Sequence, residues 1–367
     1  MTARVPFAER GGRARGLLDL ATLRYPMFLF GGSVGSLLPV FHFHDETREW
    51  LEPRLRYLVE NGYRTIAADD IARFVVDGVN PGPRAVALTF DDAWASTSTV
   101  VTPLLKQYGL RAILFAIPAR MEDERSPESL ALRRENVALP FVTWAQLRAM
   151  HDSGVWDIQS HTRSHAMVFS SDELIGFVTP SFANEPLLNR PVAVLNDRVE
   201  AVAPDALGTP LYVRRSRMSD GRRFFADQET AERCRDHVAR NGGPQFFARP
   251  DWDNDLRRVA ANASGTFESD DDRRAAIRKE LADGRALLNE KLRTTTVRDV
   301  ALPWGIAGAE TERALEETGH RLAFSQRPLQ RHGIRIGDNR HRLTRLNGKY
   351  LMSLPGRGRK WFLTAAR

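Results

Sequence analysis

Cysteine is almost absent from this chain, since Cys234 is the only one in 367 residues. A single thiol excludes a disulfide within the chain, and it excludes a metal site built from several cysteines. Cys234 lies in a polar stretch with a helical pattern, which favours an incidental side chain over a catalytic thiol. The redox compartment is left open by this count.

Long apolar runs are also absent. Residues 27–43 are mostly apolar, but glycine and serine interrupt them at Gly31, Gly32, Ser33, Gly35 and Ser36. The run is too broken for a membrane span. It is not followed by a small-residue cleavage site in the usual place, so it does not resemble a secretory signal. We therefore expect a cytoplasmic protein without a membrane span.

Acidic residues are outnumbered, with 46 Asp and Glu against 53 Lys and Arg, which gives a net charge of +7 and a pI of about 9.9. Such a balance favours anionic partners. The excess is scattered, with small clusters at 8–15, 212–223 and 340–367, and this is typical of a solvated basic surface. We expect no nucleic-acid partner. The sequence does not indicate an oligomeric state.

The most informative stretch is Ala85–Asp92, where six apolar or β-favouring residues run directly into two carboxylates. A short apolar run of this kind predicts a strand buried on both faces, as in a parallel sheet. Asp91 and Asp92 then fall at its carboxyl end, where α/β folds place their ligands. Because adjacent carboxylates repel each other, a cation is expected beside them.

Strand and helix patterns alternate on both sides of this stretch, which predicts a parallel α/β sheet or barrel. The alternation of strands and helices stops in a proline-rich segment, which we predict to be an insertion. The insertion could be a lid, a substrate-binding subdomain or a surface segment unrelated to the site. The predicted parts are a basic arm at 1–34, a first barrel part at 35–165, the insertion at 166–267, a second barrel part at 268–350 and a basic tail at 351–367.

Two imidazoles, His161 and His165, follow another predicted strand. Their spacing puts them on one side of a single turn, if the segment winds as a helix there. Together with Asp92 they predict a site for a divalent metal, most suitably Zn²⁺, although Co²⁺, Mn²⁺ and Fe²⁺ accept the same ligands. Asp91 would stay off the metal and take a proton from the attacking water.

A proton donor would be needed for an amine leaving group. His44 ends the apolar run Leu37–Asp45, which predicts the first strand of the sheet. A histidine at that position is suitable as the acid.

At this point the motifs resemble those of the polysaccharide deacetylases, the NodB-like carbohydrate esterases. Thr89-Phe90-Asp91-Asp92 is similar to the first family motif, and Ser160-His161-Thr162-Arg163-Ser164-His165 is similar to the second. The resemblance implies a distorted (β/α) barrel, often of seven strands. It also implies that Asp91 is the base and that Asp92, His161 and His165 bind the metal.

Ala301-Leu302-Pro303-Trp304-Gly305 resembles the third motif, in which the backbone N–H of the aromatic residue helps to form the oxyanion hole, so the resemblance gives Trp304 that role. Many members carry an arginine where this chain has Ala301. The branch that deacetylates poly-N-acetylglucosamine lacks it too, and Phe43-His44-Asp45 is similar to the segment that supplies the acid in that branch. His42 is the alternative donor. Ala93 stands where the family usually has glycine.

The leading hypothesis is a metal-dependent deacetylase that acts on an N-acetylated sugar, in a polysaccharide or its precursor. A second is hydrolysis of a non-sugar amide C–N bond on the same fold. A third is a non-catalytic relative that binds glycan through its basic surface. The intact set Asp91, Asp92, His161 and His165 argues against the third.

Overall fold

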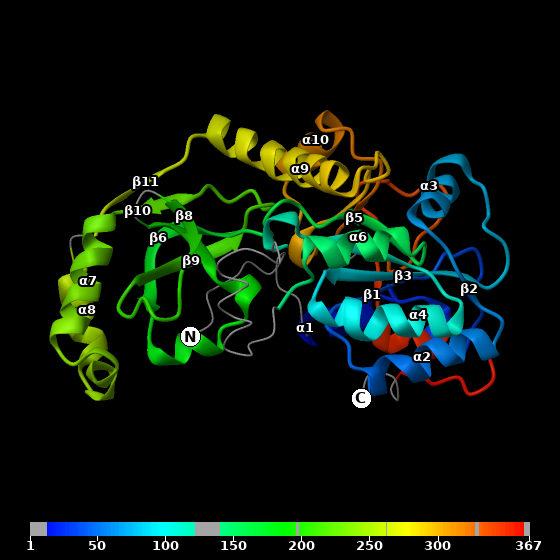
Figure 1. The fold of residues 1–367 in the computed structure, drawn as a ribbon, viewed down its shortest axis with the longest axis horizontal. Helices are drawn as coiled ribbons and strands as arrows, with labels where there is room; N and C mark the ends of the chain where they lie inside the picture. The colour runs from blue at the N-terminus through cyan, green and yellow to red at the C-terminus, as the bar shows by residue number, and fades with distance from the viewer. Residues whose placement is uncertain (1–12, 122–139, 196–197, 262, 327–329, 363–367) are drawn as a thin grey trace. The chain divides into compact units, whose positions relative to one another are not determined.

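The computed structural model describes residues 13–121, 140–195, 198–261, 263–326 and 330–362 (Figure 1). The chain divides into two compact units. In the described ranges, the barrel unit takes in residues from 13–164, 278–307 and 312–362, and the second unit takes in residues from 165–277 and 308–311. The predicted insertion, 166–267, lies inside the second unit. None of the described helices is both long and apolar enough to cross a membrane.

A parallel sheet organises the barrel unit. Its strands follow the order β13-β12-β5-β4-β3-β1-β14, with β2 paired to β3, and all of these pairings are parallel. The strands are β1 Val40–Phe43, β2 Arg64–Thr65, β3 Ala85–Asp92, β4 Ala112–Ala116, β5 Trp156–Ser160, β12 Val300–Ala301, β13 Ala323–Phe324 and β14 Leu346–Asn347. The predicted α/β barrel of parallel strands is confirmed.

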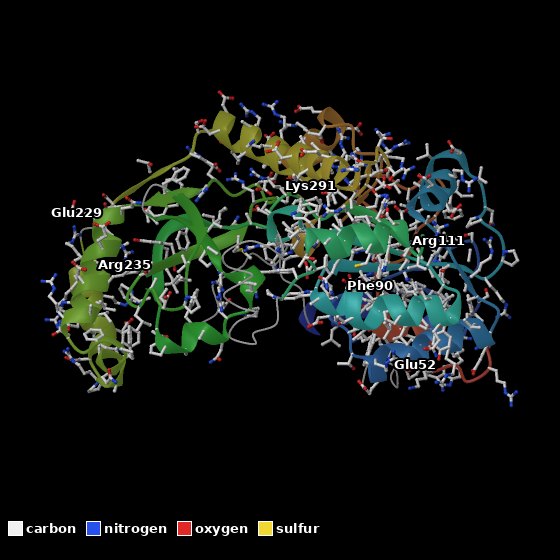
Figure 2. All side chains as sticks on the ribbon, viewed as in Figure 1. Glu52, Phe90, Arg111, Glu229, Arg235 and Lys291 are labelled. Atoms are coloured by element: carbon white, nitrogen blue, oxygen red, sulfur yellow. The ribbon has the colours of Figure 1, made fainter. Side chains whose placement is uncertain are left out.

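Strand β3 is an interior strand of this sheet and is buried over all eight residues. It has β1 on one side and β4 on the other. Phe90 stacks on Phe43 with ring centroids 4.9 Å apart, and it lies in the interior of the unit, whereas Glu52 sits on an outer helix (Figure 2). Burial on both faces explains why the strand carries no polar residue on either face before Thr89.

Helices connect the strands and cover the sheet. They are α1 Arg13–Ala21, α2 Arg48–Glu60, α3 Ala68–Asp77, α4 Thr102–Tyr108, α6 Trp144–Asp152, α9 Asp270–Leu292 and α10 Ala309–Glu317. Helix α2 packs beside α4 (Figure 1). Helix α6 begins with a capping box: Thr143 Oγ1 accepts from Gln146 N at 3.2 Å, and Gln146 Oε1 accepts from Thr143 N at 2.8 Å.

The predicted basic arm, 1–34, and basic tail, 351–367, both extend beyond the described residues. The described part of the arm is packed, since Phe28 and Leu29 are fully buried. Arg359 of the tail donates to the backbone oxygens of Gly31 and Gly32, each at 2.8 Å. The apolar segment around Phe28 is buried, and an arginine from the tail satisfies nearby carbonyl groups, so these residues are not a free surface arm.

The second unit contains a sheet that the sequence pattern did not predict. Its order is β8-β7-β6-β9, and a separate antiparallel pair joins β10 to β11. Pro191 and Pro210, which read as breakers in the sequence, are the first residues of β7 and β9, where proline is tolerated. The elements are β6 Met167–Phe177, β7 Pro191–Leu195, β8 Arg198–Ala201, β9 Pro210–Ser216, β10 Phe224–Ala226, α7 Gln228–Arg240, α8 Trp252–Val259 and β11 Gly265–Phe267.

Candidate functional site

The predicted site residues follow the carboxyl ends of strands that pair in parallel. Asp91 and Asp92 end β3, His44 follows β1, His161 follows β5, and Trp304 follows β12. Parallel register aligns these ends, since Phe43 pairs with Phe90 and Val300 pairs with Ser160. The sheet therefore directs residues from distant parts of the sequence to one edge.

Asp92, His161 and His165 come together as the sequence predicts. Each offers a ligand atom, and these atoms all lie within 4.8 Å of one another. The three side chains are buried, with exposures of 4%, 2% and 4%. Asp92 Oδ1 lies 3.4 Å from His161 Nε2. One carboxylate and two imidazoles match the ligand chemistry of a catalytic divalent metal that keeps an open coordination position.

The ring of His161 is oriented by a backbone carbonyl. Its Nδ1 lies 2.7 Å from the oxygen of Ala301, so Nδ1–H donates there and Nε2 faces Asp92 as the ligand atom. Burial opposes protonation of this ring, but the carboxylates of Asp91 and Asp92 outweigh it and raise the pKa of His161. A bound cation would have to replace that proton, so metal affinity should fall in acid.

The segment that carries the two histidines is not helical, so the condition for placing them on one side of a helical turn is not met. Thr162 has φ 63° and His165 has φ 53°, both left-handed. Glu280 on α9 holds the turn, because its carboxylate accepts from Ser164 N at 3.0 Å and from Ser164 Oγ at 2.6 Å. The irregular path, rather than helical spacing, directs both imidazoles toward Asp92.

Helix α9 approaches this turn so closely that it needs a glycine. A Cβ on Gly284 would lie 2.8 Å from Arg163 N and 3.0 Å from Ser160 Oγ. The contact with the backbone nitrogen of Arg163 is too short to form unless that backbone moves. Gly284 therefore allows the helix to reach the histidine turn, and Glu280 fixes it one helical turn away.

Arg345 is the residue of the site that sequence reasoning missed. Its guanidinium donates to both carboxylate oxygens of Asp91, Nη1 to Oδ1 at 2.6 Å and Nη2 to Oδ2 at 2.7 Å. Nη1 also donates to Thr89 Oγ1 at 3.0 Å. Burial raises the cost of ionising Asp91, but Arg345 outweighs it and holds the pKa of Asp91 well below its usual range.

The position of Arg345 explains why no local signal marked it. It precedes β14, which pairs with β1 through Phe41 and Leu346, so the sheet brings it to a carboxylate far away in the sequence. In the sequence it lies in the basic cluster 340–367, which reads as surface charge. A guanidinium beside Asp91 is thus present although the third motif carries Ala301.

His44 lies next to the site and is accessible. Its side chain is 51% exposed, and its Nε2 is 3.9 Å from Asp91 Oδ2. His42, the alternative donor, lies with its ring centroid 5.6 Å from that of His44. Desolvation by burial, reinforced by Arg345, lowers the pKa of His42 to about 3. A side chain that stays neutral near pH 7 is a poor acid, which favours His44.

Trp304 lies in a tight turn directly after β12. Its φ is 55°, and the turn is closed by Gly305 N, which donates to Leu302 O at 2.8 Å. Gln326 N donates to Gly305 O at 2.7 Å and fixes the turn to the strand region of β13. The structure places Trp304 at the predicted edge of the sheet, and its role in an oxyanion hole stays a prediction.

Left-handed backbone gathers at this edge. Non-glycine residues with positive φ number eight in the described ranges, and five of them are Asp92, Ala93, Thr162, His165 and Trp304. Such conformations cost about 1–3 kcal/mol each and tend to occur at functional sites. Ala93 adopts φ 61°, a conformation that glycine takes more readily than alanine.

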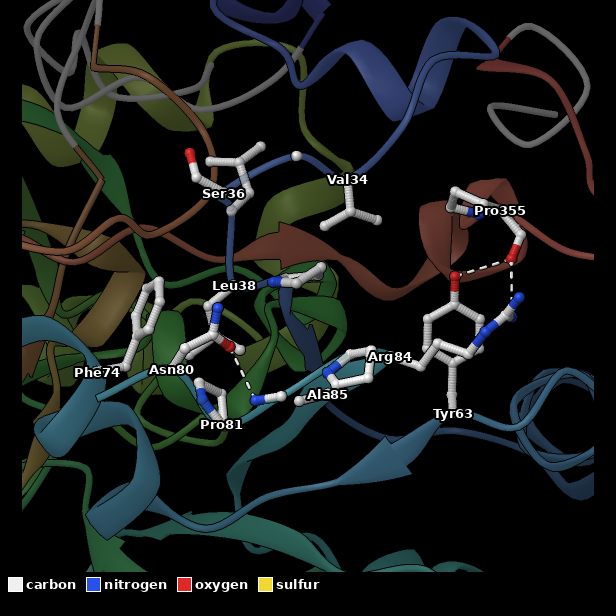
Figure 3. A pocket seen from close by; sticks show the side chains of 15 residues that line it. Val34, Ser36, Leu38, Tyr63, Phe74, Asn80, Pro81, Arg84, Ala85 and Pro355 are labelled. Carbon is white, nitrogen blue, oxygen red and sulfur yellow. Dashed lines mark hydrogen bonds between the residues drawn. The ribbon is translucent and has the colours of Figure 1, made fainter. Parts of the chain in front are cut away.

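A separate pocket lies at the other end of the strands, by the residues that precede β1 and β3 (Figure 3). Its volume is about 490 Å³, and it is lined by residues 34–39 and 80–85 with Tyr63, Phe74 and Pro355. Tyr63 Oη donates to Pro355 O at 2.8 Å within it. It contains none of the predicted site residues, so the candidate site is not this cavity.

Comparisons with known proteins agree with the motifs. A family model described as polysaccharide deacetylase matches residues 78–180. YxkH of Bacillus subtilis (strain 168), whose name assigns it provisionally to the polysaccharide deacetylases, is 24% identical over 136 residues. That alignment covers 35% of this chain and 43% of YxkH, so it spans less than half the length of this relative.

Two solved structures share the fold. The deacetylase domain of BpsB from Bordetella bronchiseptica has a TM-score of 0.53 and 21% identity, and the alignment covers 86% of this chain and 96% of that one. A de-N-acetylase from Aggregatibacter actinomycetemcomitans has a TM-score of 0.51 and 18% identity, with coverage of 84% and 94%. At this identity the likeness concerns the fold.

Proposed function

We propose that this chain, which matches a polysaccharide deacetylase family model over residues 78–180, is a metal-dependent hydrolase that removes N-acetyl groups from an amino-sugar polysaccharide or its precursor. The observation that carries the proposal is the buried set of Asp92, His161 and His165 beside an Asp91 that Arg345 keeps ionised. The names of the two proteins with solved structures, a deacetylase domain and a de-N-acetylase, support this choice of reaction.

The metal would be held by Asp92, His161 and His165, and Zn²⁺ suits this mixed set, although Co²⁺, Mn²⁺ and Fe²⁺ fit the same donors. A bound divalent cation would supply Lewis-acid polarisation of the acetyl carbonyl and make the attacking water more acidic. The hydrogen bond from His161 Nδ1 to Ala301 O orients the ring so that its Nε2 is available to bind the metal.

Asp91 would act as the base that removes the proton of the attacking water. Its low pKa keeps it ionised, and the activation of the water offsets its weak basicity. The bidentate contact with Arg345 fixes the orientation of the carboxylate.

His44 would then donate a proton to the sugar nitrogen as the amide C–N bond breaks. Its exposure of 51% and its position 3.9 Å from Asp91 fit a residue that meets substrate at the mouth of the site. The backbone N–H of Trp304 would stabilise the negative charge on the acetyl oxygen in the transition state.

The test pairs metal analysis of the purified protein with acetate release from N-acetylglucosamine oligomers, before and after treatment with a chelator. We expect one divalent ion per chain and acetate release that the chelator abolishes and Zn²⁺ or Co²⁺ restores. Bound metal without acetate release would redirect the search to a non-sugar amide. A protein that takes up no metal after Zn²⁺ or Co²⁺ is supplied would overturn the proposal.

A further inference from the structure

A sharp turn follows β3 and brings Trp94 back toward a metal-binding residue. Asp92 has φ 71° and Ala93 has φ 61°, and Ala93 N donates to Asp91 O at 2.9 Å. Because two consecutive residues are left-handed, the chain reverses within them. The indole Nε1–H of Trp94 then donates to Asp92 Oδ2 at 2.9 Å.

The indole is held in place from its other face. Trp94 stacks on Phe141 with ring centroids 4.7 Å apart and an interplanar angle of 23°. The backbones of the two residues form an antiparallel bridge. Ala95 N donates to Pro140 O at 2.9 Å, and Val142 N donates to Ala93 O at 3.0 Å. The orientation of the indole is therefore set by protein contacts that require no ligand.

The two oxygens of Asp92 consequently have different surroundings. Oδ1 lies 3.4 Å from Nε2 of His161, another residue of the candidate metal site, and Oδ2 accepts from the indole N–H of Trp94. A carboxylate can bind a cation through one oxygen or through both. An indole N–H can only donate, so it does not exchange this role with Oδ2.

We propose that Trp94 is a positioning residue that restricts Asp92 to ligation through Oδ1 alone. With Nε2 of His161 and one nitrogen of His165, the protein then offers three ligand atoms, and the remaining coordination positions are kept for water and substrate. This inference rests on the metal site of the proposed function. It differs from a packing role, in which only the ring of Trp94 would matter.

The test separates the N–H group from the ring. Trp94→Phe keeps an aromatic ring on Phe141 and removes the donor. Phe141→Leu is the matched control, since it removes the stacking and leaves the donor. Each full-length variant is titrated with Zn²⁺ against a competing chelator, and the visible absorption of its Co²⁺ form is recorded. Melting of the metal-free protein reports folding.

We expect Trp94→Phe to weaken Zn²⁺ binding about tenfold or more, in the range seen when a hydrogen-bond partner of a ligand is lost. Its Co²⁺ absorption should weaken, because Co²⁺ absorbs less as its coordination number rises. Phe141→Leu should change the Zn²⁺ affinity less than Trp94→Phe does.

An unchanged affinity and Co²⁺ spectrum in a folded Trp94→Phe protein would overturn the inference and leave the metal site standing. A larger loss in Phe141→Leu than in Trp94→Phe would also overturn it, because packing would then dominate. A wild-type protein that binds neither ion would overturn both the inference and the proposed function. If the wild type binds metal but releases no acetate, a weakened Trp94→Phe site still supports the inference.

Discussion

Two buried aspartates of the barrel unit, Asp91 and Asp299, each accept hydrogen bonds from an arginine, but their pKa values shift in opposite directions. Asp91, at the carboxyl end of β3, takes both guanidinium contacts of Arg345, and its pKa is lowered. Asp299, directly before the amino end of β12, accepts from Arg321 Nε at 3.0 Å and Nη2 at 2.5 Å. Burial nevertheless raises the pKa of Asp299.

The difference lies in the neighbours of each pair. Around Asp91 the further charges are His161 and His44, which favour its ionised form. Asp299 has Asp157 nearby, which opposes ionisation, and Arg321 is shared with Asp69. Asp299 also accepts from Leu322 N at 3.1 Å, deep in the fold. In parallel α/β folds the amino edge typically serves stability and the carboxyl edge serves chemistry, and the two pairs follow that division.

Removal of each arginine should have the largest effects, and it should distinguish the roles of the two aspartate–arginine pairs. Arg345→Met and Arg321→Met each leave a buried carboxylate without its main partner, which costs about 3–5 kcal/mol of folding free energy. Only Arg345→Met should also lower kcat for acetate release, by about a hundredfold or more, because the base loses its orientation and charge partner. Urea unfolding and assays on the folded fraction measure both effects.

Equal activity losses in the two variants would contradict the separation of roles. Metal content should be unchanged in both variants, because the hydrogen bonds described for Arg345 and Arg321 involve none of the predicted metal ligands. Metal content therefore serves as the control for an intact metal site.

His44→Ala should give the next largest effect, confined to the carboxyl edge. Cleavage of an amide should slow by about a hundredfold, because the leaving amine then lacks its proton donor. Cleavage of an activated acetyl ester should change little, because that leaving group needs little protonation. His42→Ala is the matched control. Equal losses on both substrates would speak against an acid role for His44.

As the pH falls, the two aspartates should change the unfolding free energy of the metal-free protein in opposite directions. The pKa of Asp91 lies below its ordinary 3.8, so its ionised form stabilises the fold above about pH 4, and this contribution is lost as the pH falls through the folded-state pKa. The pKa of Asp299 is raised, so its protonation relieves a cost as the pH falls. A tenfold change in the proton affinity of a carboxylate on folding corresponds to about 1.4 kcal/mol of folding free energy.

Asp91→Asn should therefore flatten the decline of the unfolding free energy between about pH 4 and pH 2. Asp299→Asn should act above about pH 4, where it removes the stability that the folded protein gains by taking up a proton on Asp299 as the pH falls. Urea unfolding at several pH values measures both slopes. The same slope change in both variants would show that the two carboxylates titrate alike.

The smallest effect is expected at Ala93. Ala93→Gly relieves a left-handed alanine but loses a buried methyl group and adds freedom to the unfolded chain, so stability should change by about 1 kcal/mol or less. Ala87→Gly, in the extended interior of β3, gains nothing in return and should destabilise the protein by more. Thermal melting of the two variants measures this difference in stability. An equal destabilisation would mean that the strain at Ala93 is negligible.

Much of the fold and most of the site are local in the sequence. The apolar run of β3 predicts its burial on both faces. The motifs at 89–92 and 161–165 predict the set Asp92, His161 and His165, because each motif lies at the carboxyl end of a strand and parallel strands align their ends. The capping box of α6 is equally local. These features need no knowledge of distant contacts.

The remainder depends on distant contacts. Arg345 reaches Asp91 only through the pairing of β14 with β1, and nothing in its own surroundings sets it apart from other basic residues. The turn from His161 to His165 contacts Glu280 and Gly284 of α9, and it is not helical, which the spacing of the two histidines alone could not show. The sheet of the second unit was hidden because its prolines start strands.

Metal content and acetate release, measured on one preparation of Asp91→Asn, test the central claim most directly. The asparagine keeps the size of Asp91 but cannot take a proton, and Asp91 is predicted to stay off the metal. We predict one divalent ion per chain, as in the wild type, with acetate release lowered by about 10²–10⁴-fold. Turnover near the wild-type level, or loss of the bound metal, would contradict the assignment of Asp91 as the base beside an Asp92, His161 and His165 metal site.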